Sequence, residues 1–373
     1  MASTAAQDTL ASLLNPLTIQ FNGPAPHDPQ ITDDRFYNRV LAGGSLALGE
    51  SYMDGWWDCA ALDEFFALVL GAGLDARVVD QPALAWAAFR AWLANRQRPS
   101  RAHQIGERHY DLGNELFEAM LDPRMIYSCA YWDQAPDLTA AQEAKLELIC
   151  QKLRLTPGQR LLDIGCGWGG LAAYAAERHG VEVLGVTVSR EQVDWGRQRW
   201  EGLPVELRLQ DYRRLDQQFD VIVSVGMFEH VGHKNYRTYM QKVADCLAPG
   251  GLFLLQTIAG NTSRTSTDPW IEKYIFPNSL LPSARQISLA AEGLLILEDW
   301  HSFGADYDKT LLAWQDNFTA NWEELAPAYG PRFQRMWHYY LMSCAGAFRS
   351  RSIQLWQIVF SKGGVPGGYD APR

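Results

Sequence analysis

From Arg160 to Ser361, short apolar runs alternate with segments whose apolar residues recur at the spacing of a helix. This difference in period separates strands from amphipathic helices. The predicted strands are 160–164, 181–186, 205–209, 219–225, 251–258, 294–299 and 354–361, and the predicted helices are 169–179, 190–200, 235–247 and 283–291. Because such alternation is typical of a mostly parallel sheet covered on both faces, the pattern predicts a doubly wound α/β domain.

The part of the chain before this domain has a different pattern. Residues 1–95 are predicted to be mainly helical, with a small strand near Leu17–Phe21 and a helix over 58–70 that ends at Gly71. Residues 95–101, which include a proline and a serine, are predicted to be a linker. We therefore expect two domains, 1–95 and 96–373.

Four further segments carry expectations of their own. Trp86, Phe89 and Trp92 fall on one face of a predicted helix, and another helix is expected from Glu107 to Leu121. The stretches 260–282 and 305–345, the second of them helical, exceed what the sheet needs. Insertions at strand ends usually build a substrate site in such folds.

A glycine-rich turn follows the first strand of the sheet. The sequence runs Asp163-Ile164-Gly165-Cys166-Gly167-Trp168-Gly169-Gly170 and then continues as a predicted helix. Glycine is needed where a backbone turns sharply or approaches a ligand. Gly165, Gly167 and Gly170 fit a dinucleotide-binding pattern. The acid two residues before the first glycine and the extra Gly169 favour S-adenosylmethionine instead.

Composition and charge narrow the classes of protein. The chain has 373 residues, 47% of them hydrophobic, and a net charge of −10, which argues against a nucleic-acid binder. Five arginines between Arg90 and Arg108 form a locally basic segment. This segment is either a solvated helix face and linker or a contact with anionic lipid.

The chain shows no pattern typical of membrane insertion, secretion or metal binding. No apolar run approaches the roughly 18 residues needed to span a bilayer, and Met1–Phe21 does not resemble a signal peptide. The six cysteines include no CxxC pair and no spacing with histidine suited to a metal. We therefore expect a cytoplasmic protein without structural disulfides or a metal site.

Four clusters of residues could carry chemistry. Glu229 and His230 follow the apolar strand 219–225, where a doubly wound fold binds its ligand. The other clusters are 109–114 with 127–132, Thr187–Gln192, and Gln210-Asp211-Tyr212.

Each cluster also has a purely structural interpretation. Glu229 could cap a helix, His230 could be a satisfied core histidine, and Cys129 could be a small buried filler. Tyr127, Tyr131 and Trp132 could be core aromatics.

Together, these motifs resemble the cyclopropane-fatty-acyl-phospholipid synthase family, whose members use S-adenosylmethionine. The resemblance covers almost the whole chain. It is carried by His109-Tyr110-Asp111-Leu112-Gly113-Asn114, Tyr127-Ser128-Cys129, Leu162 to Gly170, Phe228-Glu229-His230-Val231-Gly232, Phe303-Gly304-Ala305-Asp306-Tyr307, Gly49 to Trp57 and Ala345 to Arg349.

The resemblance implies a Rossmann-like class I methyltransferase domain and assigns residues to it. It places the cofactor against Tyr127, Ser128, Asp163, Gly165, Gly167, Thr187, Gln192, Gln210, Asp211 and Tyr212. It also implies a bicarbonate ion held by Cys129, Glu229, Ile258 and Tyr307, with His230 as a further catalytic candidate. The family has a histidine where this chain has Gln256. Glutamine can donate and accept hydrogen bonds but cannot carry a proton as imidazole does.

The implied reaction transfers a methylene group from S-adenosylmethionine to the cis double bond of an unsaturated phospholipid acyl chain. A carbocation would form, and bicarbonate would act as the base that allows the cyclopropane ring to close. Such an enzyme would work as a peripheral protein on the inner face of the membrane, with residues 1–95 contacting lipid, and a homodimer is left open. Three alternatives remain: ring-less methylation that yields a methyl- or methylene-branched chain, methylation of a small amine or phenol, and a lipid-binding protein with an inactive site.

Overall fold

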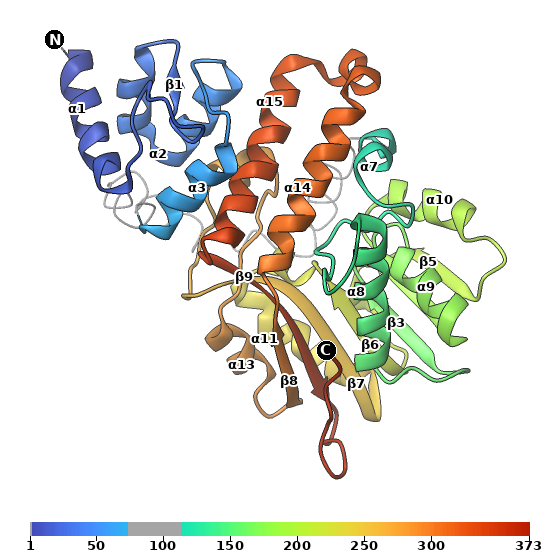
Figure 1. The fold of residues 1–373 in the computed structure, drawn as a ribbon. Helices are drawn as coiled ribbons and strands as arrows, with labels where there is room; N and C mark the ends of the chain where they lie inside the picture. The colour runs from blue at the N-terminus through green and yellow to red at the C-terminus, as the bar shows by residue number, and fades with distance from the viewer. Residues whose placement is uncertain (1, 74–112) are drawn as a thin grey trace. The chain divides into compact units, whose positions relative to one another are not determined.

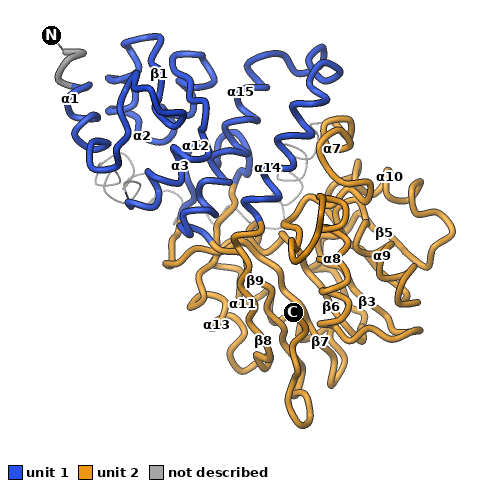
Figure 2. Tube along the Cα trace, viewed as in Figure 1, with its two compact units in different colours: residues 1–93, 266–277, 307–353 blue, residues 94–265, 278–306, 354–373 orange. Residues whose placement is uncertain are grey.

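The computed structural model describes residues 2–73 and 113–373, and it divides into two compact units. Unit 1 comprises residues 1–93, 266–277 and 307–353, and unit 2 comprises 94–265, 278–306 and 354–373 (Figure 2). The aromatic face at 86–92, the basic arginines and the motif residues 109–112 lie outside the described residues. So does the expected boundary near residue 95, which stays a prediction.

A seven-stranded sheet forms the centre of unit 2 (Figure 1). Its strands are β3 (Arg160–Ile164), β4 (Glu182–Thr187), β5 (Val205–Leu209), β6 (Phe219–Val225), β7 (Leu247–Gly260), β8 (Ile296–Ser302) and β9 (Ile353–Ser361). Their spatial order is β5-β4-β3-β6-β7-β9-β8. The pairs β3–β4, β4–β5, β3–β6 and β6–β7 are parallel, and β8–β9 is antiparallel. The predicted doubly wound α/β sheet is therefore confirmed.

This strand order also locates the ligand-binding edge of the sheet. From β3 the chain winds outward through β4 to β5, and it then returns to the other side of β3 as β6. Ligands of doubly wound folds bind beyond the carboxyl ends of the strands at such a reversal. The ends of β3 and β6 carry the glycine turn and Glu229, respectively.

Three of the described helices of unit 2 begin at a residue whose side chain caps them. The helices are α7 (Asn114–Met120), α8 (Leu138–Lys152), α9 (Gly170–His179), α10 (Arg190–Arg199), α11 (Tyr236–Cys246) and α13 (Ala284–Ala291). Asp137 caps α8, Ser189 caps α10, and Ser283 forms a capping box with Gln286 at α13. The four helices predicted among the strands are confirmed. Of the helix expected from Glu107, the described residues contain α7.

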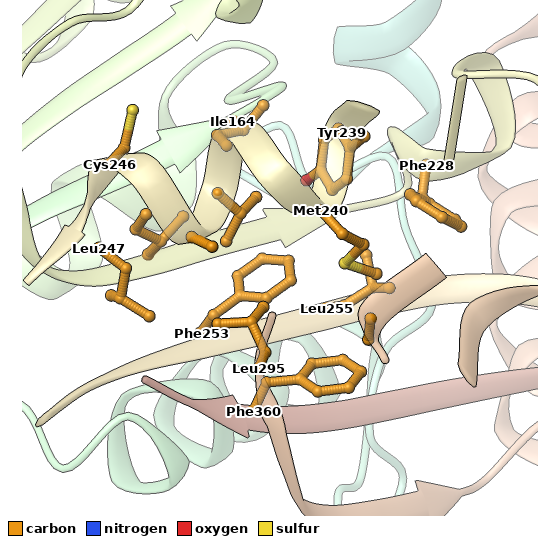
Figure 3. Packing of buried hydrophobic residues seen from close by; sticks show 14 of the residues in the cluster. Ile164, Phe228, Tyr239, Met240, Cys246, Leu247, Phe253, Leu255, Leu295 and Phe360 are labelled. Carbon is orange, nitrogen blue, oxygen red and sulfur yellow. The ribbon is translucent and has the colours of Figure 1, made fainter. Parts of the chain in front are cut away.

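The core of unit 2 follows from side chains that alternate between the two faces of the sheet. Leu161 belongs to the apolar cluster that includes α8 and α9, and its neighbour Leu162 belongs to the cluster that includes α11 and α13. Phe253 and Phe360 stack in this second cluster with their ring centroids 5.9 Å apart (Figure 3). The sheet is thus buried on both faces, which gives its strand ends fixed positions.

Unit 1 is mostly helical, as expected. It contains α1 (Ala2–Leu14), η1 (Asn15–Leu17), β1 (Gln30–Ile31), α2 (Arg35–Met53), β2 (Trp57–Asp58), α3 (Leu62–Gly71), α12 (Pro269–Tyr274), most of α14 (Ala305–Ala320), and α15 (Trp322–Arg349). The small strand predicted near Leu17–Phe21 is wrong. Pro16 lies in the 3₁₀ helix η1, and Thr18 then has a left-handed φ of 60°, which breaks an extended run.

Segments far apart in sequence pack together in unit 1. A Cβ atom on Gly49 would lie 2.4 Å from the indole ring of Trp270, so only glycine permits this approach. The Trp270 ring lies 4.5 Å from that of Tyr339, and the Tyr339 ring lies 5.3 Å from that of Phe66. These contacts explain why the two late insertions belong to the same unit as the start of the chain. Among the residues described, no helix has the length and apolarity required to cross a bilayer.

Candidate active site

The glycine turn between β3 and α9 has the backbone conformation that its residues suggest. Gly165, Gly167 and Gly169 have φ values of 84°, 54° and 82°, a region that favours glycine. A Cβ atom on Gly165 would lie 2.6 Å from the Cβ of Met227, so packing leaves no room for a side chain at this position. A Cβ atom on Gly167 would have no atom within 4 Å. Gly167 therefore leaves its backbone open to a ligand.

One cavity at this edge of the sheet gathers the predicted cofactor residues. Its lining includes Tyr127, Ser128, Asp163, Gly165, Gly167, Thr187, Gln192, Gln210, Asp211 and Tyr212. These are all ten of the residues that the sequence assigns to the cofactor, and they come from four separate segments of the chain. Their contacts with a cofactor stay predictions, but their convergence on one cavity is a property of the fold.

Hydrogen bonds hold the polar part of this lining in place. The Thr187 hydroxyl, at the end of β4, donates to Gln192 Oε1 at 2.9 Å. The backbone N–H of Gln210, after β5, donates to the Thr187 carbonyl at 2.9 Å. The Asp211 carboxylate accepts from Arg213 Nε at 2.9 Å. The ends of β4 and β5 are thus tied together on one side of the cavity.

Glu229 directly precedes His230, which lines this cavity. The orientation of the Glu229 side chain follows from strand β7, which extends beyond its last pair with β6. The last pair between β6 and β7 is Val225 with Gln256, and β7 continues beyond it to Gly260. The backbone N–H of Ile258 donates instead to Glu229 Oε1 at 2.6 Å. Glu229 therefore bonds to the extended strand rather than capping a helix.

The second carboxylate oxygen of Glu229 is buried and accepts no hydrogen bond from the described residues. Burial raises the pKa of Glu229 to about 7, because removing a carboxylate from water disfavours its charged form. The group can therefore change its charge near neutral pH.

His230 lies on the cofactor side although it follows Glu229 directly. It lines the cavity, whereas Glu229 bonds to β7. Burial lowers the pKa of His230 to about 4. The imidazole is therefore neutral at physiological pH and adds no positive charge to the cavity wall.

Gln256 forms a buried pair with Gln357, which the sequence did not single out. Both side chains are buried, and Gln357 Nε2 on β9 donates to Gln256 Oε1 on β7 at 2.9 Å. The Gln256 Nε2 group is also buried and has no acceptor among the described residues. Since Gln256 and Ile258 lie two residues apart on one strand, their side chains share a face of the sheet.

The other two residues expected at this centre have different surroundings. The Cys129 thiol is fully buried and donates to the Ala130 carbonyl at 3.2 Å. Tyr307 belongs to unit 1, where its ring stacks on Phe348 with the centroids 4.5 Å apart. Contact is thus observed between Glu229 and Ile258, while a shared site with Cys129 and Tyr307 stays a prediction.

Lys145 lines the cofactor cavity and was missed by the sequence interpretation. It lies on the face of α8 that also carries the fully buried Ala141 and Ile149, four residues before and after it. A lysine on the buried stripe of a helix is a signal that could have found it, because lysine is almost never fully buried without a partner.

The buried Glu229 carboxylate should give the protein a distinctive pH dependence of stability. Because its folded pKa lies above the ordinary value, the folded state binds this proton more tightly than the unfolded chain does. The wild-type free energy of unfolding should therefore lose this contribution as pH rises from about 5 to about 8. Relative to wild type, Glu229→Gln should gain on the order of 1–3 kcal/mol over that interval, as measured by urea unfolding. Parallel pH profiles for the two proteins would contradict this result.

Comparison with known proteins agrees with the geometry. Residues 97–358 match the family model described as mycolic acid cyclopropane synthetase. The chain is 56% identical over 351 residues to the cyclopropane-fatty-acyl-phospholipid synthase of Escherichia coli strain K12, which covers 94% of this chain and 92% of that protein.

Solved structures extend the similarity to the fold. The cyclopropane synthase MmaA2 from Mycobacterium tuberculosis superposes with a TM-score of 0.67 at 29% identity, covering 70% of this chain and 98% of that one. The mycolic acid cyclopropane synthase CmaA1 complexed with SAH and CTAB gives a TM-score of 0.65 at 31% identity, with coverage of 70% and 98%. The predicted class I methyltransferase fold is thereby confirmed. The chain belongs to the mycolic acid cyclopropane synthetase family, together with the cyclopropane-fatty-acyl-phospholipid synthases.

Proposed function

We propose that this protein is a cyclopropane-fatty-acyl-phospholipid synthase. It transfers a methylene group from S-adenosylmethionine to the cis double bond of an unsaturated phospholipid acyl chain and closes a cyclopropane ring. The observation that carries this proposal is the high identity, over nearly the full length of both chains, to the Escherichia coli synthase. The cavity at the ends of β3, β4 and β5, with its open Gly167, supports the cofactor assignment.

In methyl transfer, the protein's role is to orient the methyl donor and an acceptor of low reactivity. When bound, S-adenosylmethionine supplies an electrophilic methyl group on a sulfonium, whereas an alkene is a weak nucleophile. Holding the two in line can remove much of the barrier. Because His230 is neutral, it does not repel the positively charged sulfonium in the cavity. Tyr127 also lines the cavity, and an aromatic ring can attract a cation.

Glu229 is the carboxylate that stabilises the positive charge created by methyl transfer. Positive charge develops on the acyl chain, and a preorganised anion in a dry site stabilises it without forming a bond. Oε1 of Glu229 is fixed by the Ile258 N–H, so the unpaired Oε2 is the atom available for this role.

The residues around Glu229 fit a bicarbonate ion. When bound, bicarbonate supplies a base for the proton that leaves the new methyl group. Gln256 Nε2 is a buried donor without an acceptor, and Glu229 Oε2 is a buried acceptor without a donor among the described residues. An anion that carries both a hydroxyl and carboxylate oxygens matches this pair. Cys129, Ile258 and Tyr307 complete the proposed set.

A lipid assay tests the proposed reaction. Vesicles of a cis-unsaturated phospholipid, incubated with the protein and S-adenosylmethionine, should yield phospholipid whose acyl chain gains the mass of one CH₂ group. A phospholipid with saturated chains should gain nothing. Methylation of a small amine with no change in the lipid would replace this proposal.

We also propose that the protein binds the inner face of the membrane peripherally, through residues 1–95 and the arginines between Arg90 and Arg108. An enzyme that acts on phospholipid chains must reach the bilayer, and each arginine near an anionic surface contributes on the order of 1 kcal/mol. A homodimer, which the sequence leaves open, would show as a doubled mass in light scattering.

Binding to vesicles should therefore depend on charge. Co-sedimentation with vesicles that contain phosphatidylserine should weaken as salt rises, and reversal of Arg96 and Arg98 to glutamate should weaken it by at least about tenfold. Reversal of Arg190 and Arg199, two arginines of α10, serves as the control. Equal binding to neutral and anionic vesicles would refute the electrostatic contribution.

A further inference from the structure

Lys145 is a buried cation in the wall of the cofactor cavity. Its side chain is 1% exposed, and it lines the cavity together with Ser128 and Asp163. Its Nζ donates one hydrogen bond, to Ser128 Oγ at 2.9 Å. An ammonium has three N–H donors, so two remain for a group that enters the cavity.

The described residues do not neutralise this ammonium directly. No carboxylate among them forms an ion pair with Lys145. Asp122 favours its charged form most, followed by Cys129 and Asp163, and each acts from beyond ion-pair distance. Burial lowers the pKa of Lys145 to about 8, so the ammonium form prevails at neutral pH. A buried charge without a close partner is costly to the fold, which suggests that the partner is a ligand.

Asp163 is the complementary group on the same wall. Asp163 is buried and lines the cavity, and burial raises the pKa of its carboxyl group to about 7, although the charge of Lys145 opposes that rise. The cavity thus presents an ammonium and a carboxyl group that can lose its proton near neutral pH, and neither forms an ion pair with the described residues. The methionine tail of S-adenosylmethionine is a zwitterion that carries one ammonium and one carboxylate, and its charges match this arrangement.

We propose that Lys145, directly and through the hydroxyl of Ser128, binds the carboxylate of the methionine tail of S-adenosylmethionine. The proposal rests on the proposed function and adds to it a residue that selects a cofactor with an amino-acid tail. Asp163 then faces the ammonium end of the tail. Because Tyr127 and Ser128 belong to one loop, the same contact holds this loop against the bound cofactor.

Decarboxylated S-adenosylmethionine separates this role from a structural one, because it lacks only the carboxylate. Wild type should bind S-adenosylmethionine about 10- to 100-fold more tightly than the decarboxylated analogue, the range expected for charge-assisted hydrogen bonds. Lys145→Met should lose most of this preference. Its affinity for the decarboxylated analogue should stay within about threefold of wild type or improve, since a like charge has been removed. Calorimetry measures both affinities.

Two further variants keep the test decisive. Ser128→Ala should reduce the same preference by a smaller factor, about three- to tenfold, because Lys145 remains. Lys152→Met removes another buried lysine of α8, whose Nζ lies 3.0 Å from His301 Nδ1, and it should leave the preference unchanged. Lys152 does not line the cavity.

Equal losses of affinity for both ligands in Lys145→Met would overturn the proposal and leave Lys145 a structural residue. A wild-type protein that binds both ligands equally would overturn it as well. A wild-type protein that binds neither ligand would refute the proposed cofactor itself.

Discussion

Glu229→Gln should lower turnover about 10²-fold or more, on the scale of losing one preorganised electrostatic group. The positive charge that Glu229 stabilises forms on the acyl chain only during the reaction. The affinity for S-adenosylmethionine and the KM for lipid should therefore change little. The variant keeps an oxygen that can accept from the Ile258 N–H, which preserves the contact that positions the side chain. Turnover is measured as S-adenosylhomocysteine release in the presence of vesicles.

A matched control separates this effect from the loss of any buried carboxylate. Asp28 in unit 1 is also buried and accepts from the backbone N–H groups of Gln20 and Ala25 at 2.7 and 2.9 Å. Asp28→Asn should reduce stability while leaving kcat within about twofold. Normal turnover in Glu229→Gln would mean that the reacting centre lies elsewhere.

Gly167→Val should weaken the binding of S-adenosylmethionine at least tenfold, because the new side chain would occupy space that the cofactor needs. The free cavity has room for the first atom of that side chain, since no atom lies within 4 Å of a Cβ built there. The folded protein should therefore persist with a modest loss of stability. Calorimetry gives the affinity, and thermal unfolding gives the stability.

Gly293→Val controls for the backbone cost of this change. Gly293 also has a positive φ, 71°, and open space at its Cβ, but it lies outside the cavity. Both variants should lose stability to a similar degree, and only Gly167→Val should lose cofactor affinity. Unchanged affinity in Gly167→Val would show that this turn does not bind the cofactor.

Local patterns were sufficient to predict the sheet and its connections. Strand β6 coincides with the predicted 219–225 because its apolar run is bounded by polar residues before it and Gly226 after it. Strand β8 begins at Ile296 rather than at 294, because Leu294 and Leu295 still donate to the Ala291 carbonyl at the end of α13. Apolar character alone does not separate a helix-terminal turn from the first residues of a strand.

The same local sequence patterns could not predict contacts between segments that are far apart in the chain. The placement of 266–277 and 307–353 in unit 1 depends on contacts such as that between Gly49 and Trp270, which no local periodicity reveals. Gln357 lies within an apolar strand and carries no motif, so its pairing with Gln256 emerges only from the order of β7 and β9 in the sheet. Lys145 was missed because lysine is normally assigned to the solvent face of a helix.

The most direct test of the central claim is a proton NMR spectrum of phospholipid treated with the protein and S-adenosylmethionine. A ring and a methylene branch have the same mass, but only a ring gives the strongly shielded methylene protons of cyclopropane. Our prediction is that these signals appear together with loss of the olefinic protons of the cis double bond. Vinylidene signals, or a new methyl signal without ring protons, would contradict it and identify the enzyme as a methyltransferase that leaves a branched acyl chain.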